Sequence, residues 1–230
     1  MTDLIDTTEM YLRTIYELEE ENIVPLRARI SERLGHSGPT VSQTIGRMER
    51  DGLVVVGGDR HLELTSSGRG KAMRVMRKHR LAERLLADVI GLDWALVHEE
   101  ACRWEHVMSE SVERRILEML GNPVDSPYGN PIPGLHEIGG KTTAKFSDGV
   151  VNIVTLVHGA VGPVRAIIRR LGEPVQYESE LLEQLRGAGV LPGTKASFTA
   201  AGGYVLVEVE GFEGGLELPN EVAVHVYVGI

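Results

Sequence analysis

The chain has 230 residues, of which 42% are hydrophobic and 25% are charged, as is typical of soluble globular proteins. This composition excludes collagen, a coiled coil and general disorder. The apolar runs are far too short to span a membrane, and the first residues lack the basic and apolar regions of a signal peptide. The single cysteine, Cys102, excludes an intramolecular disulfide, and we expect a protein of the reducing cytoplasm.

The net charge of −9 argues against a nucleic-acid ligand, but the charge is unevenly distributed. Residues 1–80 hold 13 of the 24 Lys and Arg residues, and residues 26–50 carry five arginines against two glutamates. A local positive face can bind phosphates even when the whole chain is acidic. The first third of the chain is therefore the candidate for binding nucleic acid.

Three helices are predicted first, over residues 4–20, 26–34 and 37–51. Ser37 is a good N-cap for the third helix, and Pro39 fits its first turn, where the missing N–H costs nothing. Two short β runs follow at residues 53–56 and 61–65, joined by a Gly-rich turn, and they predict a hairpin. This order of elements is that of a winged helix-turn-helix.

Residues 67–120 are predicted to be helical, with breaks at Gly91 and after Ser109. Beyond a Gly-containing linker, the pattern changes to short strands with one helix at 179–188, which favours a small β-barrel. The strands are expected at residues 151–157, 196–199, 204–209, 216–218 and 222–228. The predicted class is therefore α+β, with domains at residues 1–73, 74–140 and 150–230 and a flexible linker at 141–149.

The third helix carries the candidate DNA-reading surface. Its outward positions include Gln43, Arg47 and Arg50, and a recognition helix reads base edges with its first turns. Gln43 can pair with adenine through two hydrogen bonds, and Pro39 can pack on a thymine methyl group. Phosphate contacts are assigned to Thr40, Ser42, Arg27, Arg47, Arg50 and Arg60. Thr7 and Ser37 complete the DNA-binding set. The alternative is a solvated polar face, but the tight turn and the following hairpin favour DNA.

The pentapeptide at residues 102–106 carries a possible metal site. On a helix, Cys102, Glu105 and His106 can face one point, and a thiolate, a carboxylate and an imidazole together suit a late first-row divalent metal. The alternative is a buried small cysteine beside a salt-bridged surface. From these residues alone, both interpretations stay open.

A second set is His79 and Glu83, four residues apart, with His98 further along. Such pairs also occur simply as helix-stabilising contacts. An enzyme is disfavoured, because the sequence contains no His-Glu-x-x-His, no paired Cys-x-x-Cys, no Gly-rich phosphate loop and no nucleophile elbow.

Several long stretches resemble the diphtheria toxin repressor and iron-dependent regulator family of bacterial metal-sensing repressors. They are DTTEMYLRTIY (6–16), SGPTVSQT (37–44), MRKHRLAER (76–84), EACRWEHVM (100–108) and GNPIPG (129–134). The resemblance is close over about residues 1–138. It is looser beyond them, where the family has an SH3-like domain, and it implies that the helical middle domain dimerises and binds metal.

The resemblance implies two metal sites and an anion site. The primary metal site would consist of Met10, Cys102 with its side chain and carbonyl, Glu105 and His106. The ancillary metal site would consist of His79, Glu83 and His98, completed by Glu173 and Gln176, which keep the family's Glu-x-x-Gln spacing. The anion site would consist of Arg80, Ser126 and Asn130. The base-contacting residues would be Ser37, Pro39 and Gln43.

These residues predict an iron(II)-activated homodimeric repressor of iron homeostasis genes that binds a palindromic operator and catalyses nothing. Two Fe²⁺ ions are expected per subunit, for which Mn²⁺, Co²⁺, Ni²⁺ or Zn²⁺ can substitute, and one operator could hold two dimers. A metal held by Met10 and Cys102 would tie the DNA-binding domain to the dimerisation domain. The alternatives are a manganese-responsive regulator, which the softness of these two ligands disfavours, and a metallohydrolase or thiol redox sensor.

Overall fold

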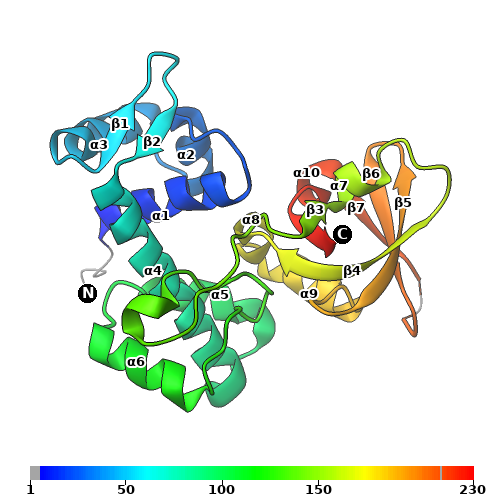
Figure 1. The fold of residues 1–230 in the computed structure, drawn as a ribbon. Helices are drawn as coiled ribbons and strands as arrows, with labels where there is room; N and C mark the ends of the chain where they lie inside the picture. The colour runs from blue at the N-terminus through cyan, green and yellow to red at the C-terminus, as the bar shows by residue number, and fades with distance from the viewer. Residues whose placement is uncertain (1–5, 213) are drawn as a thin grey trace. The chain divides into compact units, whose positions relative to one another are not determined.

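The computed structural model describes residues 6–212 and 214–230, and the chain divides into two compact units (Figure 1). Unit 1 contains the described residues up to Ala82, Ala101–Val124 and Ile132–Lys145. Unit 2 contains Glu83–Glu100, Asp125–Pro131 and Phe146–Ile230. The expected class, α+β with an N-terminal winged helix-turn-helix, a helical segment and a C-terminal antiparallel sheet, is confirmed.

The winged helix forms the first part of unit 1. Its elements are α1 (Thr7–Glu20), α2 (Arg27–Leu34), α3 (Gly38–Arg50) and the antiparallel hairpin of β1 (Val54–Val56) and β2 (Leu62–Leu64). The predicted start of the first helix at residue 4 lies outside the described residues. Asp6 caps α1, and its carboxylate accepts hydrogen bonds from the backbone N–H groups of Thr8 and Glu9. Ser37 caps α3, as predicted, by accepting a hydrogen bond from the backbone N–H of Thr40.

The core of the winged helix forms because α1 and α3 each present an apolar stripe. Val41, Ile45 and Met48 of α3 are fully buried, as their helical spacing predicts. They belong to one apolar cluster with Tyr11, Leu12, Ile15, Leu18, Ile30, Leu53, Val54, Leu62, Leu64 and Ala72. The hydroxyl of Tyr11 lies 2.8 Å from Nδ1 of His36, so α1 also holds the turn that precedes α3.

The wing is joined tightly to the next helix, α4 (Ser66–Leu85). The Thr65 hydroxyl donates to the carbonyl oxygen of Gly52 at 2.7 Å. A Cβ on Gly68 would lie 1.9 Å from the carbonyl oxygen of Leu53, so only glycine permits this approach of the α4 backbone to the base of the wing. The first turn of α4 is therefore fixed to the hairpin.

The helical middle segment follows. It contains a π-helical turn (Leu86–Ile90), a 3₁₀ turn (Trp94–Leu96), α5 (Val97–Trp104), α6 (Glu110–Met119) and a 3₁₀ turn (Leu135–Ile138). The predicted break at Gly91 is confirmed by its left-handed conformation with φ of 73°. The helix before Ser109 ends earlier than expected, because residues 105–107 form a turn. The expectation that Cys102 and His106 share a helix is therefore wrong.

A buried arginine holds the helices of unit 1 together. Arg77 of α4 donates from Nε to Glu113 of α6 at 2.6 Å. Its Nη1 donates to the carbonyl oxygen of Gly134 at 3.0 Å and to Glu137 at 2.8 Å. Because Arg77 and Glu113 are each 1% exposed, this pair replaces water as the partner of both charges.

Unit 2 is built on a six-stranded antiparallel sheet of order β3-β8-β4-β5-β6-β7 (Figure 1). The strands are β3 (Val150–Asn152), β4 (Val164–Leu171), β5 (Lys195–Ala201), β6 (Tyr204–Val209), β7 (Leu216–Pro219) and β8 (Val226–Gly229). The helices are α7 (Ile153–Val157), α8 (Glu173–Gln176), α9 (Ser179–Gly187) and α10 (Asn220–Ala223). The predicted helix at residues 179–188 and the strands near 196, 204 and 216 are confirmed.

Two strand predictions in unit 2 are wrong in part. Residues 153–157 form α7 rather than the end of a strand, because Asn152 accepts a hydrogen bond from the N–H of Thr155 and caps a helix. Residues 220–223 form α10, and β8 begins only at Val226. The eight-residue strand β4 was not predicted, although it lies in the middle of the sheet.

Candidate metal centres and DNA-binding surface

The end of α5 carries a thiol, a carboxylate and an imidazole within five residues of unit 1. Cys102 lies in the last turn of α5, and Glu105 and His106 follow in the turn that ends it. Glu105 is fully buried, and His106 Nε2 lies 3.3 Å from its Oε1. Arg13 of α1 contacts both Glu105 and Cys102, with Nη1 at 2.6 Å from Oε2 and 3.3 Å from Sγ. This donor set fits a late first-row divalent ion.

The electrostatics of this cluster keep Glu105 ionised. Burial alone would raise the pKa of Glu105, but the Arg13 charge and the hydrogen bond with His79 outweigh it and lower that pKa to about 2. Nδ1 of His79 lies 2.8 Å from Oε2 of the same carboxylate. The site therefore offers a carboxylate anion at neutral pH, as a cation ligand must.

Met10 lies on α1 between two residues that contact this cluster. Its neighbour Glu9 contacts His106, with Oε2 at 2.6 Å from Nδ1. Arg13, one helical turn after Met10, contacts Glu105 and Cys102. Met10 is itself half-buried and lies between these two contacts along the helix. The structure thus brings α1 to the end of α5 on both sides of the predicted thioether ligand.

A second buried cluster forms within unit 2 from Glu83, His98 and Glu173. Nδ1 of His98 lies 3.2 Å from Glu83 Oε1 and 3.5 Å from Glu173 Oε2. One ligand atom from each residue lies within 4.8 Å of the others, and all three are at most 2% exposed. Gln176, which follows Glu173 by three residues in α8, is also buried, and its Oε1 has no hydrogen-bond partner among the described residues. An unsatisfied buried carbonyl oxygen suits a metal ligand.

His79 was predicted for this second cluster. It precedes Glu83 by one turn of α4, so both can point from the same helical face. Its Nδ1 also contacts Glu105, as described above.

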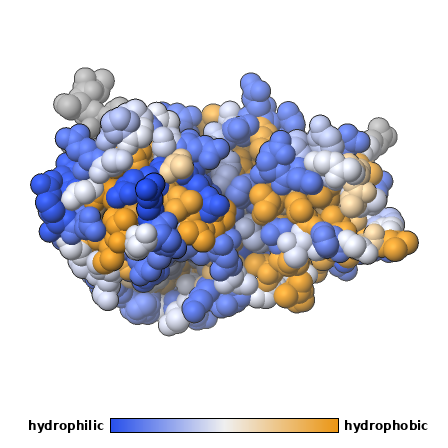
Figure 2. All heavy atoms as spheres, turned by 90° about the horizontal axis from the view of Figure 1, so that it is seen from above, coloured by the Kyte–Doolittle hydropathy of each residue, from blue (hydrophilic) through white to orange (hydrophobic). Residues whose placement is uncertain are grey.

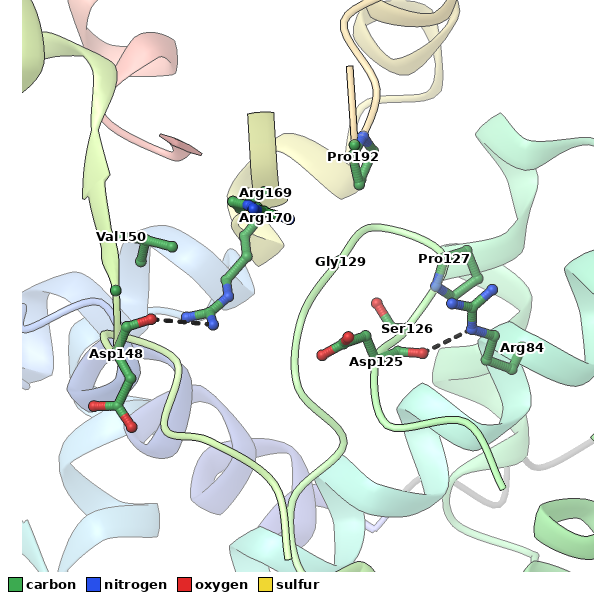
Figure 3. A pocket seen from close by; sticks show the side chains of 12 residues that line it. Arg84, Asp125, Ser126, Pro127, Gly129, Asp148, Val150, Arg169, Arg170 and Pro192 are labelled. Atoms are coloured by element: carbon green, nitrogen blue, oxygen red, sulfur yellow. Dashed lines mark hydrogen bonds between the residues drawn. The ribbon is translucent and has the colours of Figure 1, made fainter. Parts of the chain in front are cut away.

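The three residues predicted to bind an anion have different surroundings. Arg80 donates to both oxygens of Glu20, at 3.1 and 2.6 Å. Asn130 donates from Nδ2 to the carbonyl oxygen of Leu171 at 2.9 Å. Ser126 lines a cavity of about 600 Å³ in unit 2, shown in Figure 3.

Three arginines line this cavity together with Ser126. Arg84 donates from Nε to the carbonyl oxygen of Asp125, and Arg170 donates to that of Asp148, as the dashed lines in Figure 3 mark. Arg169 is the third. A small anion could enter this cavity, although Arg80 and Asn130 do not line it.

The predicted DNA-reading side chains lie on the outside of the winged helix. The exposed ones are Thr7, Ser37, Pro39, Thr40, Ser42, Gln43, Arg47, Arg50 and Arg60. Figure 2 views the molecule from above and shows a mostly hydrophilic face with smaller apolar patches. Arg60 sits in the turn of the wing with φ of 70°. Arg27 differs, because it is only partly exposed and its Nε is buried.

The sequence interpretation missed the charged residues of α1 that surround the metal cluster. Arg13 is 4% exposed and forms an ion pair with Glu17, whose Oε1 lies 2.9 Å from its Nε. The available signal was the spacing of Met10 and Arg13, because residues three apart on a helix share a face. From the sequence alone, an arginine that is buried beside a metal ligand is hard to distinguish from an arginine exposed to solvent.

Comparison with known proteins identifies two family domains in the chain. The family model "Iron dependent repressor, N-terminal DNA binding domain" matches residues 3–62, and "Iron dependent repressor, metal binding and dimerisation domain" matches residues 65–134. The chain is 58% identical to the iron-dependent repressor IdeR of Mycobacterium tuberculosis, over 97% of this chain and 96% of that protein. It is 55% identical to the diphtheria toxin repressor of Corynebacterium efficiens, over 97% of this chain and 95% of that protein.

Solved structures agree with this assignment. The crystal structure of T. acidophilum IdeR is 30% identical with a TM-score of 0.77, and the match covers 98% of both chains. A manganese-dependent transcriptional repressor in complex with manganese is 25% identical with a TM-score of 0.81, over 97% of this chain and 99% of that chain. None of the described helices is long and apolar enough to cross a membrane.

Proposed function

Because the chain belongs to the iron-dependent repressor family, we propose that it is an iron(II)-activated transcriptional repressor that binds operator DNA as a homodimer. Residues 1–73 would be the DNA-binding domain, 74–140 the dimerisation and metal-binding domain, and 150–230 the SH3-like domain after a linker. The protein would act in the cytoplasm on genes of iron homeostasis, without catalysing a reaction.

The observation that carries this proposal is the position of the Cys102, Glu105 and His106 cluster. It lies in the same unit as the winged helix, and its charged groups contact Glu9 and Arg13 of α1. Metal binding to this cluster would therefore change the contacts that Glu9 and Arg13 of α1 make with it. Since α1 packs in one apolar core with α3, its position bears on that of the recognition helix.

Met10, Cys102, Glu105 and His106 would hold the primary ion. When bound, the ion supplies a positive charge and directional bonds that join the thioether on α1 to the ligands after α5. Met10 and Cys102 are soft donors and favour Fe²⁺ over Mn²⁺, although affinity order alone cannot exclude Co²⁺, Ni²⁺ or Zn²⁺. By linkage, metal and operator DNA would strengthen each other's binding by the same free energy.

Glu83, His98 and Glu173, with His79 and Gln176, would hold a second ion in each subunit. Arg80, Ser126 and Asn130 would bind an anion next to it. Two buried carboxylates and an imidazole whose ligand atoms lie within 4.8 Å of one another support a cation at this place.

The exposed N-terminal turns of α3 would read a palindromic operator. Ser37, Pro39 and Gln43 would contact base edges, and the basic residues would contact phosphates. A dimer would place two recognition helices in successive major grooves, and a second dimer could share the operator.

A manganese-responsive regulator is the second candidate, because the manganese-dependent repressor described above has the same fold. The thiol and thioether donors favour iron, as argued from the donor set.

The test is anaerobic fluorescence anisotropy on a palindromic, A·T-rich DNA at one fixed salt concentration, with Fe²⁺, Mn²⁺ or chelator. We expect tight binding with Fe²⁺ and weak binding with chelator. His106→Ala should abolish the activation while leaving the circular dichroism spectrum unchanged. Equal DNA binding with and without metal would refute activation, and metal-activated binding by His106→Ala would refute the primary-site assignment.

A further inference from the structure

Arg13 is a buried cation in contact with two of the proposed primary metal ligands. It is 4% exposed, and its Nη1 lies 2.6 Å from Glu105 Oε2 and 3.3 Å from Cys102 Sγ. The same Nη1 lies 3.3 Å from Nδ1 of His79. One guanidinium nitrogen therefore faces a carboxylate, a sulfur and an imidazole at once, which is the kind of environment that a metal ion also selects.

A divalent ion held by Glu105 and Cys102 would lie about 2.0 to 2.3 Å from each ligand atom. It would then be next to Nη1, and two positive charges at such a separation in a buried site repel strongly. The N–H groups of Arg13 also point at the lone pairs that the ion would need. The guanidinium and the ion therefore compete for the same two ligands.

Arg13 has a second anchor that survives such an exchange. Its Nε lies 2.9 Å from Glu17 Oε1, one turn later on α1, as an ion pair. Glu17 is 1% exposed and also lies 3.4 Å from Arg33, so it stays paired when the Arg13 tip moves. The Arg13 side chain can thus leave Glu105 and keep Glu17 as a counter-charge.

We propose that Arg13 is an internal counter-cation of the primary metal site, and that its guanidinium must leave Glu105 and Cys102 for a divalent ion to bind there. The inference rests on the proposed assignment of that site. Arg13 is thereby an affinity-determining residue: it raises the metal concentration at which the protein responds. When an ion binds, the contacts of Arg13 with Glu105 and Cys102 would be replaced by the bond from Met10 to the ion as the link between α1 and the end of α5. Met10 and Arg13 lie one turn apart on α1.

The experiment is a direct titration of the full-length protein with Co²⁺, without DNA. Ligation of Cys102 gives a thiolate-to-cobalt charge-transfer band in the near ultraviolet, so the primary site is observed separately from the second cluster. Arg13→Met removes the charge and keeps the apolar stem, and we expect it to tighten Co²⁺ binding at this band at least tenfold. Arg13→Lys keeps a cation and should stay within about threefold of the natural protein.

Arg33→Met is the matched control. Arg33 pairs with Glu17 and Glu21, and its loss leaves the contacts of Arg13 with Glu105 and Cys102 in place, so Co²⁺ affinity should stay unchanged. Thermal melting of each variant establishes that it is folded, and Arg13→Gln replaces Arg13→Met if the latter is not.

The outcomes separate the two proposals. Unchanged or weaker Co²⁺ binding by the folded, uncharged Arg13 variant would overturn the counter-cation role, as would equal tightening by Arg13→Lys. A natural protein without the thiolate band, or with a band that Cys102→Ser does not remove, would instead overturn the primary-site assignment.

Discussion

Removing the carboxylate of Glu113 should destabilise unit 1 strongly, because it leaves the Arg77 guanidinium buried without its closest counter-charge. Arg77 and Glu113 are each 1% exposed, and their side chains are joined at 2.6 Å. Breaking a buried pair from one side costs about 3 to 5 kcal/mol. Arg77 keeps its contact with Glu137, which is partly exposed, so we expect the lower end of this range, about 3 kcal/mol.

The assay is urea unfolding of Glu113→Ala, followed by circular dichroism and tryptophan fluorescence at a fixed protomer concentration with chelator present. A loss of about 3 kcal/mol corresponds to roughly 6 to 12 °C in Tm for a chain of this size. Glu118→Ala is the control on the same helix, because Glu118 pairs with Arg115 where both side chains are mostly exposed. It should change the free energy of unfolding by less than about 0.5 kcal/mol.

A double variant separates the charge effect from packing. Arg77→Met combined with Glu113→Leu removes both charges at once, and we expect it to recover most of the stability that Glu113→Ala loses. A loss below about 1 kcal/mol in Glu113→Ala, or a double variant no more stable than the single one, would refute the argument that an uncompensated buried charge sets the cost.

Three further predictions concern DNA reading, pH and metal choice. Gln43→Ala should weaken operator binding by about 1 to 3 kcal/mol in anisotropy titrations and leave random DNA nearly unaffected, because Gln43 is exposed and is proposed to contact a base. Equal losses on both DNAs would contradict this proposal. The hydrogen bond from Arg74 lowers the pKa of Glu137 to about 2, so its ionised form stabilises the fold above about pH 4.5, and this contribution is lost as the pH falls toward 2. Glu137→Gln should flatten the acid limb of the stability curve by about 1 kcal/mol after allowance for partial exposure, and an unchanged limb would exclude the contribution. Met10→Asp combined with Cys102→Glu should shift the ratio of Mn²⁺ to Fe²⁺ midpoints for DNA binding toward Mn²⁺, and a constant ratio would show that ligand softness does not select the metal.

The winged helix could be predicted closely from the sequence, because its signals are local and agree with one another. Ser37, Pro39 and the spacing of Val41, Ile45 and Met48 each indicate the same helix, and the structure places all of them accordingly. Local consistency of this kind is what makes a pattern reliable.

The C-terminal region was less predictable because a helix cap and a strand irregularity interrupt its alternating pattern. The β-branched run after Val150 suggests one strand, but the single hydrogen bond accepted by Asn152 turns it into a helix. Strand β4 was obscured by its arginines, since Arg169 is exposed while Arg170 is buried after a shift in strand register. A bulge breaks the alternation on which strand prediction depends.

The sequence identifies the candidate metal ligands by residue type, but it does not identify Arg13 as the cation beside them. The sequence indicates which residues can bind a metal, whereas the role of Arg13 depends on α1 meeting the end of α5 in space. Nor does the sequence indicate that Gln176 Oε1 is buried without a hydrogen-bond partner, which is known only from the folded structure.

The close approach of Gly68 to the carbonyl oxygen of Leu53 fixes the angle of the hairpin about the axis of α4. Each residue of an α-helix turns the chain by about 100°, so one residue inserted between Thr65 and Gly68 would rotate the winged helix by that angle relative to the rest of α4. The carbonyl oxygen of Leu53 would then face a side chain instead of bare backbone. In a dimer joined through later segments, this angle would fix the distance between the two recognition helices. The spacing of operator half-sites would then depend on the length of the Thr65–Gly68 junction as much as on the residues that touch DNA.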